Sequence, residues 1–196
     1  MIKNKCVILI SGRGSNMEAI FKSSQSGELK ELCEVVLVAA DKESAGGLAR
    51  AESLGIKTAF VPSKGKSREE FENDLLAVLL PLYPDFVILA GFNRILTKHF
   101  ISAFPNRIIN IHPADTRSFQ GLHGYAWAFE NKLASTMITV HFVDEGVDTG
   151  NIIAQSVIDI SSASSLEEVE HIGLAREHSF YCETLKDLFL KLNKEE

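Results

Sequence analysis

Short apolar runs alternate with helically periodic stretches along the first two thirds of the chain. Residues 6–10 (CVILI) and 34–40 (EVVLVAA) are apolar almost throughout, which is typical of strands buried on both faces of a sheet. Three later runs predict further strands, and the stretches between the runs predict helices. The further strands are expected at 58–62, 85–92 and 107–112, and the helices after the SGRGSN turn and at about 44–55, 67–83 and 122–131.

The last third of the chain has a different pattern. Residues 136–143 and 151–160 alternate apolar and polar positions like half-exposed strands of an antiparallel edge, and a long helix is expected at about 165–192. Ser67 with Glu70 three residues later forms a capping-box pattern at one helix start. The alternation of strands and helices predicts an α/β fold, with a doubly wound, mostly parallel sheet and an antiparallel edge, in a Rossmann-like architecture. We expect one domain over 1–196.

Composition narrows the function classes. The 196 residues are 45% apolar and 23% charged, with a net charge of -6, so no basic surface for nucleic acid or for an anionic membrane is expected. No apolar run approaches the roughly 20 residues of a membrane span. The N-terminal MIKNKCVILISGRG leads straight into a glycine turn without a cleavage site, and we interpret it as a first strand rather than a signal peptide. Cys6, Cys33 and Cys182 are expected to be reduced packing residues of a cytoplasmic protein.

The stretch RIINIHPADT (107–116) combines a strand pattern with reactive side chains. Side chains alternate faces along a strand, so Asn110 and His112 lie on one face while Ile109 and Ile111 pack on the other. Pro113 has no N–H for the ladder, so the pairing should stop there. An amide and an imidazole therefore share the carboxyl end of a strand, which is where open α/β sheets bind their ligands. A hydrogen-bonded core histidine is the alternative.

The stretch ISGRGSN (10–16) follows the first strand and opens the first helix. Its glycines allow a tight turn, and the amides of Gly14, Ser15 and Asn16 would face outward at the positive end of the helix dipole, as in a phosphate site. Met17 stands where the dinucleotide fingerprint has its third glycine, and the nucleotide P-loop pattern is absent. A nicotinamide role with Asp41 on the ribose is therefore disfavoured. A plain tight turn is the remaining alternative.

Other polar clusters carry weaker signals. HFVDEGVDTGN (141–151) is predicted to be an acidic loop between two late strands, and its Asp148 matters only if the fold brings it to His112. The remaining histidines show no metal-ligand spacing and no cysteine cluster joins them, so no metal is expected. They are His99, His123, His141, His171 and His178. No G-x-S-x-G elbow of a serine hydrolase occurs.

Six motifs in register carry a family resemblance over nearly the whole chain. They are VILISGRGSN, AGFNRIL, NIHP, GLH, VHFVDEGVDTG and REHSFY. In these stretches the chain resembles the glycinamide ribonucleotide transformylases, a folate-dependent formyltransferase family of purine synthesis. The resemblance implies a formyltransferase fold, an enzyme that transfers a formyl group from 10-formyltetrahydrofolate to the amine of N1-(5-phosphoribosyl)glycinamide, and these two small molecules as partners. It leaves a homodimer open.

The resemblance also implies residue roles. It assigns the catalytic group to Asn110, His112 and Asp148, with Asn110 donating to the oxyanion, His112 acting as imidazolium, and Asp148 holding that ring and favouring its charge. The implied substrate-binding residues are Gly14, Ser15, Asn16, Leu174 and Glu177. The implied folate-binding residues are Arg68, Asn93, Arg94, Ile95, Leu96, Asn110, Asp144, Glu145, Gly146, Val147 and Asp148.

Two departures from the family pattern stand out. After NIHP the family commonly has Ser-Leu-Leu-Pro, whereas this chain has Ala114-Asp115-Thr116-Arg117 with the spacing to GLH kept. We expect this charged loop beside the active site, with an effect on folate binding and turnover. The strand before His141 also reads TMITVH where the family more often has Gly-Thr-Ser before Val-His.

Three rival functions remain. Methionyl-tRNA formyltransferase shares the trio but adds a C-terminal domain, which an acidic chain ending at KLNKEE disfavours. A formyltetrahydrofolate hydrolase keeps the trio but normally has an additional N-terminal regulatory domain. A non-catalytic nucleotide-binding α/β module predicts phosphate binding without formyl transfer, and a folate-product assay separates it from the enzyme.

Overall fold

The computed structural model describes residues 3–195, and its centre is a seven-stranded sheet. The order is β3-β2-β1-β4-β5-β6-β7, with β1 to β5 parallel and β6 and β7 each antiparallel to the preceding strand. The predicted mostly parallel sheet with an antiparallel edge is therefore confirmed. The strands are β1 (Asn4–Ile10), β2 (Cys33–Ala40), β3 (Thr58–Phe60), β4 (Phe86–Leu89), β5 (Ile108–His112), β6 (Ser135–Phe142) and β7 (Ile152–Asp159).

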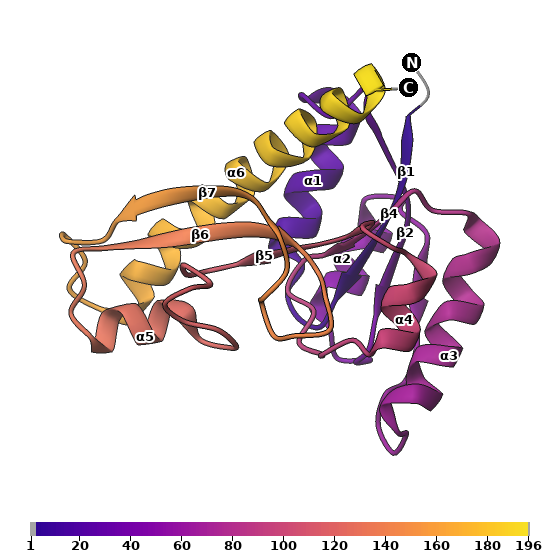
Figure 1. Ribbon diagram of the computed structural model, residues 1–196, viewed down its shortest axis with the longest axis horizontal. Coiled ribbons are helices and arrows are strands. Elements are labelled where there is room, and N and C mark those ends of the chain that lie inside the picture. Colours follow the sequence, from indigo (N-terminus) through magenta and orange to yellow (C-terminus); the bar gives the residue numbers. More distant parts are fainter. Residues whose placement is uncertain (1–2, 196) are drawn as a thin grey trace.

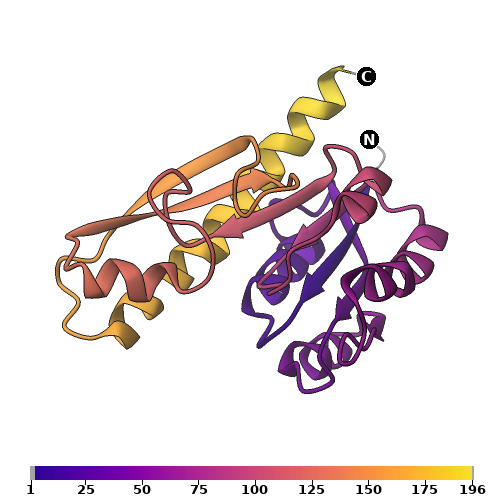
Figure 2. The same cartoon turned by 60° about the horizontal axis from the view of Figure 1, so that its bottom comes forward.

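Helices cover both faces of this sheet (Figure 1). They are α1 (Ser15–Ser26), α2 (Gly46–Ser53), α3 (Arg68–Leu79), α4 (Lys98–Ala103), α5 (Gly124–Glu130) and α6 (Leu166–Glu195), with a 3₁₀ turn at Leu80–Leu82. The first, second, fifth and sixth helices pack on one face and α3 and α4 on the other. Alternate residues of β1 feed the two apolar layers, Ile8 on one side and Leu9 on the other, because side chains of a strand alternate. Figure 2 shows β6, β7, α5 and the first half of α6 extending together beyond the parallel strands.

Several predicted boundaries shift for local reasons. The helix expected to reach residue 83 ends at Leu79, because Pro81 lacks an amide hydrogen and Tyr83 turns into a left-handed conformation with φ 49°. The strand expected at 85–92 ends at Leu89, since Gly91 at φ 75° turns the chain. The capping box of Ser67 is confirmed, with both reciprocal hydrogen bonds present.

Two elements depart further from the sequence expectation. β6 is mostly buried rather than half-exposed, because it lies between β5 and β7 inside the sheet. The six-residue α4 was not predicted, and a helix so short carries too few turns for periodicity to reveal it.

Candidate active site

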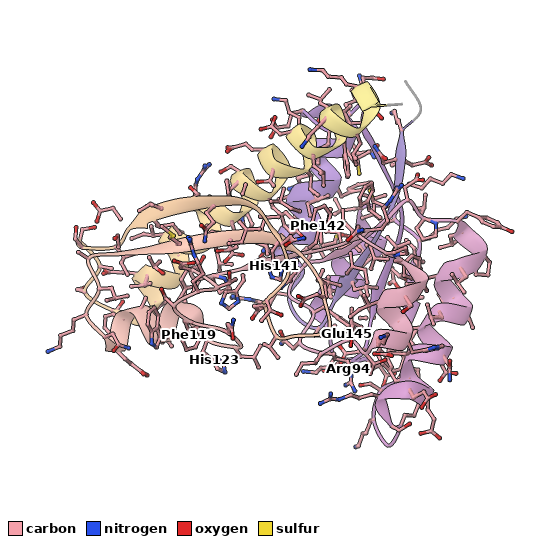
Figure 3. The ribbon with its side chains drawn as sticks, in the orientation of Figure 1. Arg94, Phe119, His123, His141, Phe142 and Glu145 are labelled. Atoms are coloured by element: carbon pink, nitrogen blue, oxygen red, sulfur yellow. The ribbon has the colours of Figure 1, made fainter. Side chains whose placement is uncertain are left out.

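A pocket of about 570 Å³ opens at the carboxyl ends of β1, β4 and β5. The loops that follow these three strands line it, together with the β6–β7 loop and one turn of α6. In an open α/β sheet this edge, where the strand order reverses between β1 and β4, is the expected ligand site. In Figure 3 the labelled Phe119 and His123 lie on the α5 side, Arg94 and Glu145 lie on the α4 side, and His141 lies where the strands converge.

The loop after β1 ends in a helix N-terminus whose amides have no side-chain acceptor. Gly14 is the N-cap of α1 at φ 73°, and no side-chain hydrogen bond caps the helix. A Cβ at Gly14 would come within 2.9 Å of the Gly47 backbone, so both the conformation and the packing require glycine. The free amides and the helix dipole together suit an anion.

A buried carboxylate lies next to this helix start. Glu177 of α6 accepts hydrogen bonds from Asn16 Nδ2 and from the Tyr125 hydroxyl, both at 2.6 Å. Burial raises the pKa of Glu177 above its ordinary value, and the two hydrogen bonds only partly offset this effect. Leu174, one turn earlier on α6, lines the same part of the pocket.

The predicted catalytic trio comes together in the structure. Asn110 Nδ2 donates to Asp148 Oδ1 at 3.2 Å, and His112 Nδ1 lies 3.3 Å from Asp148 Oδ2. Asn110 and His112 project from one face of β5, while Ile109 and Ile111 pack in the core on the other, as alternation predicted. β5 pairing ends at His112, directly before Pro113. The fold thus brings an acid from the β6–β7 loop to a strand about 36 residues earlier in the chain.

The environment of His112 differs from the sequence expectation. His112 is 3% exposed, and its Nε2 faces the Phe119 carbonyl at 3.0 Å. Burial lowers the pKa of His112 below its ordinary value, although the Asp148 charge and the Phe119 hydrogen bond oppose this shift. Asp148 therefore favours the charged ring, as expected, but burial outweighs it in the free protein.

Asp148 itself is held in its ionised form. Burial opposes its ionisation, but hydrogen bonds from His141 and the Gly121 amide, with the charge of His112, bring its pKa below the ordinary value. The Gly121 amide donates to Oδ2 at 2.9 Å, which ties the loop after β5 to the loop after β6. The carboxylate is thereby fixed on both oxygens.

The loop after β4 forms the other wall. The Asn93 amide donates to Ser11 Oγ at 2.9 Å, which joins this wall to the loop after β1. The Arg94 guanidinium lies 4.7 Å from the centre of the Phe71 ring and 3.5 Å from Asp41 Oδ2. Asp41, considered above for a ribose role, is outside the pocket and pairs with an arginine instead.

The acidic loop after β6 is folded on itself. Asp144 Oδ1 accepts hydrogen bonds from the Gly146 amide at 3.0 Å and from Thr149 Oγ1 at 2.6 Å. A Cβ at Gly150 would lie 1.8 Å from the Phe142 carbonyl oxygen, so only glycine fits where the loop returns to the sheet. These contacts present Val147 and Asp148 to the pocket.

Most of the predicted site residues line this one pocket. They are Gly14, Ser15, Asn16, Asn93, Arg94, Ile95, Leu96, Asn110, His112, Asp144, Gly146, Val147, Asp148, Leu174 and Glu177. Two do not: Arg68 is exposed at the start of α3, and Glu145 is exposed and pairs with Lys98 at 3.5 Å.

The substituted loop after NIHP does not line the pocket either. Asp115 accepts hydrogen bonds from the backbone and side chain of Arg117 and from Gln155 of β7. Ala114 is fully buried, and its carbonyl accepts from Thr139. These residues brace the turn that carries Phe119 to His112 and Gly121 to Asp148, so the expected effect of this loop on a ligand of the pocket is indirect.

Sequence reasoning missed three polar residues of the pocket, which are Arg13, His123 and His141. His141, considered only as a metal ligand, pairs in register with Asn110, and its Nε2 lies 3.4 Å from Asp148 Oδ1. The alternation of β6 puts His141 on the same sheet face as Asn110 once these strands pair, but their register is not readable from sequence. Arg13 lines the pocket as well, and its place between the two glycines of the turn was the available signal.

The described residues contain neither a cluster of metal-ligating side chains nor a membrane-spanning helix. Within residues 3–195, no group of three or more histidine, cysteine, aspartate or glutamate residues is arranged to hold a metal ion. In the same part of the chain, no helix is both long enough and apolar enough to cross a membrane.

Comparisons with known proteins agree with this geometry. A profile of the formyl transferase family matches residues 4–185. The chain is 35% identical to phosphoribosylglycinamide formyltransferase of Escherichia coli K12, covering 89% of this chain and 82% of that protein, and 35% identical to the Bacillus subtilis enzyme of that name, covering 94% of each. The crystal structure of phosphoribosylglycinamide formyltransferase from Bacillus halodurans superposes with a TM-score of 0.88, at 37% identity over 94% of both chains.

Proposed function

This chain belongs to the formyl transferase family, and on that premise we propose that it transfers the formyl group of 10-formyltetrahydrofolate to the amine of N1-(5-phosphoribosyl)glycinamide in purine synthesis. Its similarity to proteins named phosphoribosylglycinamide formyltransferase supports this pair of substrates. We assign the whole chain to one formyltransferase domain, which the continuous sheet supports. We place the enzyme in the cytoplasm, which the three buried, unpaired cysteines support.

One observation carries the proposal. The amide of Asn110, the imidazole of His112 and the carboxylate of Asp148 converge in a pocket whose other end is an uncapped helix N-terminus. The first three groups suit acyl transfer, and the last suits the phosphate of the acceptor. A ligand that carries a phosphate at one end and a nucleophile at the other fits this arrangement.

The ribonucleotide binds at the α1 end of the pocket in this proposal. The amides of Gly14, Ser15 and Asn16 hold its phosphate, and Glu177 accepts hydrogen bonds from its hydroxyls, with Leu174 beside them. The uncapped helix start and the pocket-facing position of Glu177 support these roles.

The formyl donor occupies the wall formed by the loops after β4 and β6. Asn93 to Leu96 line one side, and Asp144, Gly146 and Val147 line the other. The first segment follows β4, whose Leu89 pairs with Asn110, and the second leads directly into Asp148, so a folate held between them directs its formyl group to the trio. Arg68 and Glu145 lie outside the pocket, and we assign them no direct contact in this state.

The reaction forms one C–N bond and breaks another. The amine attacks the formyl carbon, the carbonyl oxygen becomes an oxyanion, and the N10–carbon bond of the folate then breaks. Asn110 donates an N–H to the oxyanion by exchanging its 3.3 Å contact with His141. One such donor contributes about 10²–10³ in rate. No covalent intermediate with the protein is required.

The amine must lose a proton, and the folate N10 must gain one. The lowered pKa of His112 favours its neutral ring, which can take the proton from the amine and then deliver it to N10. For this step the neutral ring carries its hydrogen on Nδ1, where it is donated to Asp148 Oδ2. Nε2 leaves the Phe119 carbonyl, takes the proton from the amine and passes it to N10, while Asp148 stabilises the imidazolium that forms in between.

Spectrophotometric release of tetrahydrofolate tests the proposal. Purified protein is mixed with glycinamide ribonucleotide and 10-formyltetrahydrofolate, and we expect product only when both are present. Product without ribonucleotide would identify a hydrolase, and product only with methionyl-tRNA would identify the tRNA formyltransferase. Binding of the ribonucleotide without product from any of these mixtures would favour a non-catalytic nucleotide-binding module.

A further inference from the structure

The hydroxyl of Tyr125 reaches Glu177 by passing over a glycine of α6. Tyr125 is 7% exposed, and its Oη donates to Glu177 Oε1 at 2.6 Å. A Cβ at Gly173 would lie 2.2 Å from Tyr125 Cζ and 2.4 Å from its Oη. The tyrosine can therefore take this position only because residue 173 has no side chain.

We propose that Tyr125 and Gly173 form a positioning pair that fixes the carboxylate of Glu177 for hydroxyl donors of the ribonucleotide. Gly173 lies one helical turn before Glu177, so both residues share the face of α6 that meets α5 and the pocket. This inference rests on the proposed function, because it concerns how the acceptor substrate is held.

The glycine is unfavourable for the helix that contains it. Gly173 lies in the interior of the 30-residue α6, where glycine is among the poorest helix formers. It is also buried at the α5–α6 contact. A close approach of another group accounts for glycine at such a position, and here that group is the ring of Tyr125.

The hydrogen bonds of Glu177 leave part of its carboxylate for a ligand. A carboxylate offers about four acceptor positions, and Tyr125 and Asn16 occupy one on each oxygen. Within residues 3–195, no lysine, arginine or histidine forms an ion pair with it. Two neutral donors therefore fix its orientation without neutralising its charge, and its remaining acceptor positions suit hydroxyl donors.

Asn16 supplies a second, independent sign of a ligand. Its side chain is 93% buried and lines the pocket, and its Oδ1 has no hydrogen-bond partner although its Nδ2 is bound to Glu177. A buried acceptor without a donor is costly unless a ligand supplies one. Two neighbouring hydroxyls, as on a ribose, can satisfy Glu177 and Asn16 together.

Removal of the hydroxyl alone is the first test. Tyr125→Phe keeps the ring and the packing, so we expect it to raise the KM for glycinamide ribonucleotide about tenfold, the effect of a charge-assisted hydrogen bond. The kcat and the folate KM should stay within about twofold. Isothermal titration of the ribonucleotide gives the same comparison without turnover. Tyr181→Phe is the matched control, since its hydroxyl is also buried but donates to the Leu89 and Ile109 carbonyls.

A double-mutant cycle tests the pairing with the glycine. Gly173→Ala should displace the intact ring and raise the ribonucleotide KM at least as much as Tyr125→Phe does. In a Tyr125→Leu background, which lacks Cζ and Oη, the same alanine should add little. Full additivity of the two changes would overturn the pairing.

The outcomes separate the inference from the proposed function. If wild-type protein transfers the formyl group but Tyr125→Phe leaves the ribonucleotide KM and affinity unchanged, the positioning role is wrong and the function stands. If wild-type protein binds the ribonucleotide without transfer, the titrations still decide the positioning role. If it neither binds nor transfers, both are wrong. Should Gly173→Ala fail to fold, Tyr125→Phe decides, with its thermal melt as the measure of folding.

Discussion

Asp148 is the residue through which the proposed catalytic groups are joined. Its two oxygens contact Asn110, His112, His141 and the Gly121 amide. Its backbone adopts φ 52°, in the left-handed region that disfavours a residue with a side chain. Strained backbone persists where surrounding contacts hold it, and such strain clusters at functional sites. The side-chain contacts of Asp148 provide that hold.

Replacement of this carboxylate should slow turnover without preventing binding. Asp148→Asn keeps the size but removes the charge that raises the His112 pKa, so that pKa should fall further below its ordinary value. His112 then becomes a weaker base and its imidazolium is less stabilised, so kcat should drop by about 10² or more. The acid limb of the pH–rate profile should move to lower pH, and the loss relative to wild type should shrink as pH is lowered.

NMR titration of His112 in both proteins checks the cause. An unchanged His112 pKa with near-normal kcat would contradict the role of Asp148. Glu145→Gln is a suitable control, because Glu145 belongs to the same loop but is exposed and outside the pocket. It should leave the pH profile as in wild type.

Individual residues were predictable where a local rule determines them. Strand alternation places Asn110 and His112 on one face, and Pro113 ends the strand. The shared face and the end of the strand can therefore both be predicted from five residues of sequence. The partnership of His141 with Asn110 depends on strand register, and the balance between burial and charge at His112 depends on atoms from distant segments. Neither the register nor the burial is available before the chain is folded.

At the scale of elements, the loop after β1 and the start of α1 form the proposed phosphate site. Gly14→Val imposes a β-branched residue on a left-handed backbone and directs its Cβ against Gly47. We expect the ribonucleotide KM to rise at least about tenfold, since the loop must move away from its anion-binding form. The folate KM should change much less. Steady-state kinetics with each substrate varied in turn measures both.

Gly65 provides a control, because a valine there strains the backbone as it does at Gly14 but lies outside the pocket. Gly65 has φ 80°, a Cβ added there would meet no atom within 4 Å, and the residue lies outside the pocket. Gly65→Val should cost stability of roughly 1–2 kcal/mol for the left-handed residue and leave both KM values unchanged. An equal effect of the Gly14 and Gly65 variants on the ribonucleotide KM would sink the phosphate assignment.

A buried acid of α3 anchors the end of the segment that we propose to bind folate. Glu72 is 1% exposed and accepts hydrogen bonds from the amide and the hydroxyl of Thr97, directly after the Asn93–Leu96 segment. Glu72→Gln cannot accept at both oxygens, so we expect a lower melting temperature from one lost hydrogen bond. The segment that Thr97 anchors should then loosen and raise the folate KM several-fold. A changed ribonucleotide KM with an unchanged folate KM would contradict this.

Elements with strong periodicity were predictable, and short ones were not. The parallel strands and the capping box at Ser67 follow from pattern alone. The six-residue α4 and the contact of Glu72 with Thr97 do not, because they join segments whose packing is decided by the whole sheet. The burial of β6 has the same origin, since its pattern resembles an edge strand but β7 covers its outer side.

At the scale of the molecule, the pocket joins the two parts of the sheet. The proposed phosphate site belongs to the parallel strand β1, whereas Asp148 belongs to the connection of the antiparallel strands β6 and β7. α6 contacts α1, α5 and both antiparallel strands, so it spans the same two parts. A ligand held at both ends of the pocket therefore links elements that are far apart in the sequence.

Ligand-linked stability follows from this placement and tests the two ends of the pocket separately. A ligand at 100 times its Kd stabilises the native state by about 2.7 kcal/mol, which for a chain of this size raises Tm by about 5–11 °C. We expect that rise for wild type with glycinamide ribonucleotide, measured by differential scanning calorimetry at one fixed ligand concentration.

Asp148→Asn should show nearly the same rise, because it removes a charge used in transfer and leaves the phosphate site intact. Gly14→Val, with its affinity lowered tenfold or more, should show about half of that rise or less. A full rise in Tm with Gly14→Val would mean that the phosphate is not held at α1. Loss of the rise in Tm with Asp148→Asn would mean that the carboxylate binds substrate rather than assisting the proton transfer.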